Sequence, residues 1–448
     1  MARDVRLPLQ EFIQTEGVGS AMLLAAAIIA LVIANSPAAD AFHRLLETRI
    51  SLDLAVVAIS NSVHHWVSEG LMALFFLVVG LEIKRELLHG HLADRRKAAL
   101  SVFAALGGMA GPALVYFALN AGGAGERGWG IPMATDIAFA LGVLGLLGKG
   151  IPAQLRVFLL ALAIVDDLGA ILVIAFFYTE QINVGALGAG AVILAGIMLL
   201  RSVGVRSMAA YGVPAFLFWV AIQQSGIHAT IAGVILAFLT PARPYYGGGT
   251  ALTYGRTLLD RLERATASGD HDDIEATLGQ LEELAVGTES PLERLERKLH
   301  PWTALVVLPL FALVNAGVAV SPENLMSAAR SPVALGIAGG LLAGKFAGIF
   351  GTSWLAVRLG VAVLPEGVQW EHIAGASLLG GVGFTVSLFI TELAFTDPGV
   401  VDTAKLAILV ASLLAGAAGF LALRAVARRT AQPEIRPGSS PPRRRPAP

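Results

Sequence analysis

Long apolar segments recur along almost the whole chain of 448 residues, and they restrict it to few kinds of fold. Only 15% of the residues are charged, whereas an average soluble chain carries about 25%. The mean hydropathy is +0.70, and many segments reach the roughly 20 apolar residues that a helix needs to cross a bilayer. We therefore predict an all-α polytopic membrane protein, since a helix satisfies its own backbone hydrogen bonds in lipid.

Hydropathy divides the chain into about twelve transmembrane helices and three polar segments. The predicted spans are 17–36, 58–83, 98–119, 130–148, 153–178, 184–200, 207–224, 226–240, 301–320, 332–357, 372–396 and 403–424. Grouped into domains, we expect a cytoplasmic N-terminus (1–16), spans one to eight (17–240), a cytoplasmic amphipathic connector (241–299), spans nine to twelve (300–426), and a disordered tail rich in Arg and Pro (427–448).

The distribution of positive charge orients these spans. Most of the 32 Lys and Arg residues fall in the N-terminal segment, the tail and the loops that twelve spans place on the same side. Positively charged loops stay in the cytoplasm, so both termini are predicted to be cytoplasmic. The N-terminal segment has no short apolar core with a cleavage site, so no removable signal peptide is expected. The absence of Cys excludes disulfides and thiol catalysis.

Among the ionisable side chains of the predicted spans, four point to chemistry: Asp136, the adjacent Asp166 and Asp167, and Lys345. A charged side chain at the centre of a bilayer costs roughly 3 kcal/mol on insertion scales. Two neighbouring carboxylates also disfavour each other's ionisation. A single such residue is often part of a structural ion pair, but four together indicate a site that handles protons or cations.

The adjacent carboxylates are expected to have different tasks. Neighbouring residues of a helix point about 100° apart, so Asp166 and Asp167 face different surroundings. We expect one to line a water-filled cavity, where it exchanges a proton for a small cation, and the other to pair with Lys345. Na⁺ or Li⁺ would suit a carboxylate helped by a hydroxyl, carbonyls and water. No His–Cys cluster offers a transition-metal site, and no cofactor is expected.

Two predicted spans carry a break. In span 130–148, Pro132 removes a backbone donor and Thr135-Asp136 resembles the N-cap of a second half-helix. Span 372–396 has a matching weak point at 380–383. Each broken span is the middle member of a trio, and the second broken span comes seven positions after the first, which is an odd number. This arrangement predicts inverted-topology repeats whose interrupted helices cross at a transporter's binding site.

Six sequence motifs resemble those of the NhaA family of bacterial Na⁺/H⁺ antiporters, and the resemblance runs from about residue 16 to residue 424. They are Phe75–Leu87, Ala134–Gly142, Ala163–Ala170, Ser225–Thr230, Leu299–Trp302 and Gly344–Lys345. The resemblance implies a multi-pass protein of the bacterial inner membrane that extrudes Na⁺ (or Li⁺) in exchange for inward protons. It also implies electrogenic exchange, activation at alkaline pH and a homodimer.

The resemblance further implies roles for particular residues of this chain. Asp167 is the principal ligand of Na⁺, and Asp166 is a second carboxylate of the same site, able to pair with Lys345. Thr135 joins the cation- and proton-binding group, beside Asp136 at the helix crossing, where Asp136 and Lys345 offset the facing helix dipoles. The residues implied in pH sensing are Glu82, Arg85, Glu86, Glu296 and His228.

Other classes of protein fit the sequence less well. A cation channel needs a selectivity filter, usually in a ring of subunits, and none is recognisable. A sodium-coupled symporter for an organic solute needs more polar residues than the spans provide. An intramembrane aspartyl protease typically has a Gly-x-Gly-Asp motif, which does not occur in the chain. We therefore expect a transporter and not an enzyme, with the lipid bilayer and small ions as partners and no nucleic acid.

Overall fold

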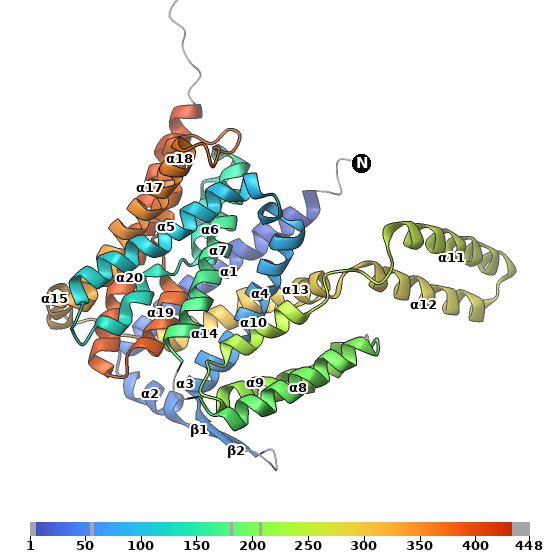
Figure 1. Ribbon diagram of the computed structural model, residues 1–448, viewed down its shortest axis with the longest axis horizontal. Coiled ribbons are helices and arrows are strands. Elements are labelled where there is room, and N and C mark those ends of the chain that lie inside the picture. Colours follow the sequence, from blue (N-terminus) through green and yellow to red (C-terminus); the bar gives the residue numbers. More distant parts are fainter. Residues whose placement is uncertain (1–5, 54–57, 180–181, 206–207, 432–448) are drawn as a thin grey trace, which may run out of the picture.

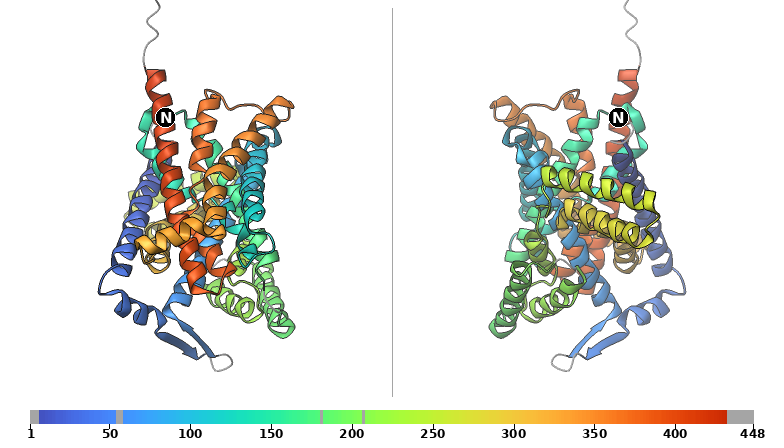
Figure 2. Two further views of the ribbon diagram at one scale, coloured as in Figure 1. Left: turned by 90° about the vertical axis from the view of Figure 1, so that its left-hand side faces the viewer. Right: turned by 90° about the vertical axis from the view of Figure 1, so that its right-hand side faces the viewer.

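The structure is a computed structural model, and it describes residues 6–53, 58–179, 182–205 and 208–431. Helices dominate it, and they form one body with a projecting helical pair (Figure 1). The start of the first helix and the end of the last helix lie at one end of this body, and a small β-hairpin lies at the other (Figure 2).

The helices follow one another with short connections. Before the projecting pair they are α1 (Arg6–Ala34), α2 (Ala39–Glu47), α3 (Val63–His65), η1 (Trp66–Leu71), α4 (Met72–His89), η2 (His91–Ala93), α5 (Arg95–Asn120), η3 (Glu126–Met133), α6 (Ile137–Leu146), η4 (Gly148–Gly150), α7 (Ala153–Phe177), α8 (Val184–Ser202), α9 (Met208–Gln224) and α10 (Thr230–Leu239). The projecting pair is α11 (Gly248–Ser268) and α12 (His271–Thr288). After it come α13 (Pro291–Trp302), η5 (Thr303–Val307), α14 (Leu308–Asn315), α15 (Pro322–Arg330), α16 (Pro332–Gly339), η6 (Gly340–Gly344), α17 (Lys345–Arg358), α18 (Trp370–Leu379), α19 (Phe384–Ala394) and α20 (Pro398–Ala431).

The described residues contain nine helices that are long and apolar enough to cross a membrane, and the bent pair α18 and α19 makes a tenth. The protein is therefore an all-α polytopic membrane protein, with fewer clear spans than the twelve predicted. The predicted spans 207–224 and 226–240 correspond to α9, with 17 residues, and α10, with 10. The second is short because a turn at Gly226 (φ +81°) precedes the helix.

The only strands in the described part of the chain form the β-hairpin. β1 (Arg49–Asp53) pairs antiparallel with β2 (Ala58–Ser62). The indole Nε1 of Trp66 donates a hydrogen bond to the carbonyl of Ile50, and this contact ties the hairpin to η1. The hairpin is therefore held against the helical body at the end opposite the start of α1.

The helices α11 and α12 extend away from the body as a hairpin of their own (Figure 1). Gly269, in the left-handed region at φ +68°, ends α11, and the side chain of Asp270 caps α12 by accepting from the backbone N–H of Asp273. The buried side chains Leu258 and Leu284 lie one on each helix of the pair. The charged residues of both helices are mostly exposed, so the pair is amphipathic.

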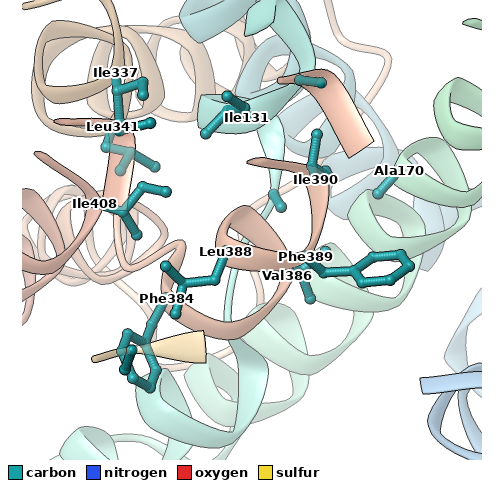
Figure 3. Packing of buried hydrophobic residues seen from close by; sticks show 14 of the residues in the cluster. Ile131, Ala170, Ile337, Leu341, Phe384, Val386, Leu388, Phe389, Ile390 and Ile408 are labelled. Atoms are coloured by element: carbon teal, nitrogen blue, oxygen red, sulfur yellow. The ribbon is translucent and has the colours of Figure 1, made fainter. Parts of the chain in front are cut away.

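The main hydrophobic core surrounds α19, which is buried on all sides. Its residues Phe384 to Thr391 are buried without exception. Figure 3 shows Leu388 of this helix on the side of Leu341 and Ile408, whereas Phe389 points to the opposite side, toward Ala170. A helix that is apolar on every face belongs in the centre of a bundle. The break before α19 is therefore deep inside the protein.

Glycines allow α5 and α17 to pack backbone against backbone. Gly107 and Gly111 of α5 face Gly348 of α17 and Gly344 at the end of η6, and a Cβ on any of the four would overlap the backbone of the facing helix. These two helices make one of the most extensive contacts in the protein. The close approach matters for the site because α17 begins at Lys345.

We predict that Gly348→Ala lowers the thermal unfolding midpoint of the detergent-solubilised protein by several degrees. The added methyl group forces the two helices apart, and overpacking of this kind costs about 1–3 kcal/mol. Gly351→Ala on the same helix is the matched control, because a Cβ there meets open space. Equal unfolding midpoints for the two variants would show that the glycine contact is not required for close packing.

Candidate functional site

Two non-helical segments meet in the centre of the protein. Residues 134–136 separate η3 from α6, and residues 380–383 separate α18 from α19. The backbone N–H of Asp136 donates to the carbonyl of Val382 at 2.6 Å. The Thr135 hydroxyl donates to the carbonyl of Gly380 at 3.0 Å. Each break therefore satisfies backbone groups of the other, which explains how both persist in a buried place.

Asp136 caps the helices that begin at both breaks. One carboxylate oxygen accepts from the backbone N–H of Phe139 in the first turn of α6, at 3.0 Å. The other accepts from the backbone N–H and the hydroxyl of Thr385 in the first turn of α19, at 3.1 and 2.7 Å. A negative charge is stabilised at a helix N-terminus, and here one carboxylate serves two of them.

Lys345 and Asp166 form a fully buried ion pair. The Lys345 ammonium lies 2.6 Å from Oδ2 of Asp166 and also donates to the Thr135 hydroxyl at 2.9 Å. Both charged side chains are almost completely shielded, with exposed fractions of 0% and 1%. The π-helical turn η6 immediately precedes Lys345, and such turns occur frequently at functional sites. The pair joins α7 to α17 beside the first helix break.

Asp167 is not part of this ion pair, and one of its carboxylate oxygens has no hydrogen-bond partner in the described part of the chain. Its Oδ2 is buried and has no hydrogen-bond partner among the described residues. The side chain borders a cavity of about 60 Å³, with room for a few water-sized particles. The polar residues around this cavity are Glu82, Thr135, Asp136, Asp167, His300, Thr303 and Thr385. A carboxylate in such a space can hold a proton or a small cation.

A second ionic cluster lies at one edge of the cavity. Arg85 of α4 lies 2.5 Å from Glu296 of α13 and 3.7 Å from its neighbour Glu86. His300 lies 3.8 Å from Glu82, and both of these residues border the cavity. The structure thus brings together four of the five residues implied in pH sensing and connects them to the space beside Asp167.

The fifth residue, His228, lies apart from that cluster. Its ring packs edge-on against Phe389, with centroids 6.4 Å apart. Glu69, in η1, and His65, just before it, interact with the ring electrostatically. The ring atom Nδ1 is buried and has no partner in the described part of the chain. His228 therefore lies against the core helix α19 and is not part of the cluster of Glu82, Arg85, Glu86 and Glu296.

Sequence reasoning missed three polar residues of the cavity wall. Thr385 anchors Asp136, His300 contacts Glu82, and the hydroxyl of Thr303 donates to the carbonyl of His300 at 2.8 Å. A signal for Thr385 was present, because a hydroxyl directly after a Gly-rich break is well placed to bind at the start of a helix. Nothing in the sequence indicated Thr303, which resembles any other Thr in an apolar span.

Comparisons with known proteins agree with what the geometry of the site indicates. The family model described as Na⁺/H⁺ antiporter 1 matches residues 10–423. The chain is 46% identical over 422 residues to Na⁺/H⁺ antiporter NhaA 1 of Saccharophagus degradans, covering 92% of this chain and 90% of that protein. It is 45% identical over 439 residues to NhaA of Acidithiobacillus ferrooxidans, covering 94% and 98%. The chain therefore belongs to the NhaA family of Na⁺/H⁺ antiporters.

Proposed function

We propose that this protein is an electrogenic antiporter that extrudes Na⁺ (or Li⁺) in exchange for inward protons by alternating access. The observation that carries the proposal is Asp167, a buried carboxylate with an unpartnered oxygen beside a small polar cavity. Its neighbour Asp166 is already neutralised by Lys345. The site therefore offers one negative charge ready for a cation and a second that becomes available only when an ion pair opens.

The mechanism is competition between protons and Na⁺ for the same carboxylates. When Na⁺ enters the cavity, it displaces a proton from Asp167 and takes oxygen ligands from the walls and from water. Separation of Lys345 from Asp166 frees a second carboxylate and allows the lysine to release its proton. More than one proton is then exchanged for each Na⁺, which makes the cycle electrogenic.

The break contacts suggest what moves. We assign spans four and eleven to η3–α6 and α18–α19, the two interrupted helices that meet through Asp136 and Thr385. In the full arrangement, α9 and α10 complete twelve spans with inverted-topology repeats. The helices around the crossing rock against the remaining helices and expose the loaded site to either side. Both termini are then cytoplasmic, in the bacterial inner membrane, with residues 1–16, 241–299 and 427–448 outside the spans 17–240 and 300–426.

The ionic cluster at the edge of the cavity suits regulation by pH. The Arg85–Glu296 pair requires an ionised carboxylate, and it joins α4 to α13, which also carries His300. Protonation of the cluster would loosen α13 beside the cavity. We assign pH sensing to Glu82, Arg85, Glu86 and Glu296, with His228 acting separately through α19.

Four further assignments complete the proposal. The protein works as a homodimer, carries no cofactor, is not an enzyme and has the bilayer and small ions as its partners. A cation channel and a sodium-coupled symporter are the alternatives. A channel would pass current without counter-transported protons, and a symporter would move Na⁺ and its solute in the same direction.

Everted membrane vesicles that hold a proton gradient test the exchange directly. We predict that added Na⁺ or Li⁺ collapses the gradient of the wild type, read with a pH-sensitive dye, and that K⁺ has little effect. Asp167→Asn keeps the shape of the side chain but removes its charge, so the response should be lost. Asp260→Asn, on the exposed hairpin, is the control and should behave as the wild type.

Repetition of this assay from mildly acidic to alkaline pH should show activity rising with pH. Collapse by K⁺ alone, or a normal response from Asp167→Asn, would contradict the assignment of the site.

The buried ion pair gives a second prediction. Lys345→Met leaves Asp166 buried without its partner, which typically costs about 3–5 kcal/mol, and it should lower the thermal unfolding midpoint and abolish exchange. Lys345→Met combined with Asp166→Asn removes both charges, so its midpoint should recover much of the loss, although exchange stays absent. Thermal unfolding of the purified variants in detergent measures the two midpoints, and the vesicle assay measures exchange. A double variant less stable than Lys345→Met would mean that the two residues act independently.

A further inference from the structure

Thr303 borders the same cavity as Asp167 but belongs to a different part of the protein. It is the first residue of the π-helical turn η5, between α13 and α14, whereas Asp167 lies on α7. The side chain is buried, with an exposed fraction of 6%. A wider turn of this kind places a residue outside the regular helical register and is common at functional sites.

The hydroxyl of Thr303 is oriented by its own helix. It donates its proton to the carbonyl of His300 at 2.8 Å. A hydroxyl carries one donor and two acceptor lone pairs, so both lone pairs of Oγ1 remain for another partner. None of the described residues has a hydrogen bond directed to this oxygen in the structure. A residue of the cavity wall therefore carries a neutral oxygen whose two lone pairs have no partner in the described part of the chain.

Of the two other threonine hydroxyls of the cavity wall, one has two partners and the other is bound to a carboxylate. The Thr135 hydroxyl donates to the carbonyl of Gly380 and accepts from Lys345, so it is occupied while the ion pair is closed. The hydroxyl of Thr385 donates to Asp136, which also accepts from two backbone N–H groups. In this state Thr303 carries the threonine hydroxyl of the cavity wall that is bound neither to Lys345 nor to a carboxylate.

We infer that Thr303 Oγ1 is an oxygen ligand of the transported cation and holds it with Asp167 while Lys345 still occupies Asp166 and Thr135. The inference rests on the proposed Na⁺/H⁺ exchange and names a ligand that the motifs of the sequence did not indicate. A hard cation requires several oxygen ligands, and a cavity this small leaves space for few waters to supply them. Thr303 raises Na⁺ affinity before the second carboxylate is released.

The test compares variants of nearly equal shape. Thr303→Val replaces the hydroxyl by a methyl group and should raise the half-saturating Na⁺ concentration in the vesicle assay about tenfold, which corresponds to the loss of one ligand. The maximal rate should stay within about twofold, since Asp167, Asp166 and Lys345 are intact. Thr303→Ser keeps the oxygen and should restore near-normal affinity for Na⁺.

Thr391→Val is the matched control for loss of a buried Thr hydroxyl. Thr391 is fully buried on α19, donates to the carbonyl of Ser387 and does not border the cavity. It should leave the half-saturating Na⁺ concentration unchanged. An unchanged value for Thr303→Val overturns the inference, and so does an equal rise for Thr303→Ser or Thr391→Val, because either rise would reflect packing and not ligation.

Calorimetric titration of NaCl into the purified protein separates this inference from the proposed function. If the wild type fails to exchange Na⁺ for protons but binds Na⁺, the proposed function is wrong. The dissociation constant for Na⁺ still tests whether Thr303 is a ligand. A Thr303→Val dissociation constant about ten times that of the wild type supports the ligand. Dissociation constants that agree within about twofold, or a wild type without measurable Na⁺ binding, refute it.

Discussion

The ion pair between Lys345 and Asp166 is the interaction on which the site depends. Two opposite charges, both almost completely shielded, are stable there only because each compensates the other and Thr135 accepts a further hydrogen bond from the lysine. Desolvation of such a pair is costly, so it contributes little net stability. In the proposed mechanism the closed pair leaves Asp167 to bind the cation, and opening of the pair frees Asp166 as a second carboxylate.

The two non-helical segments that meet, 134–136 and 380–383, lie beside this ion pair. Asp136 binds the first turns of both α6 and α19, and Thr135, its neighbour, contacts Lys345 on one side and the second break on the other. Two adjacent residues therefore connect both breaks to the ion pair. The close glycine contact between α5 and α17 fixes the helix that begins at Lys345 against α5.

The all-α membrane fold and the charged residues of the site were predictable from the sequence, because charges inside apolar spans are rare and conspicuous. Helix α7 begins and ends within a residue of the predicted span 153–178. The sequence overestimated α10, because hydropathy does not detect the turn at Gly226 that shortens it. It also missed Thr303, since only the π-helical turn and the bond to His300 distinguish that hydroxyl from others in apolar helices.

Proton release on cation binding tests the central claim, competition for one pair of carboxylates, most directly. Purified protein in weakly buffered detergent solution, with a pH indicator present, would receive Na⁺ in small additions. The account predicts that protons appear in the solution, saturate as the site fills, and are absent for Asp167→Asn. Na⁺ binding detected by its heat but without released protons would contradict the account, because the cation would then occupy a site that protons do not share.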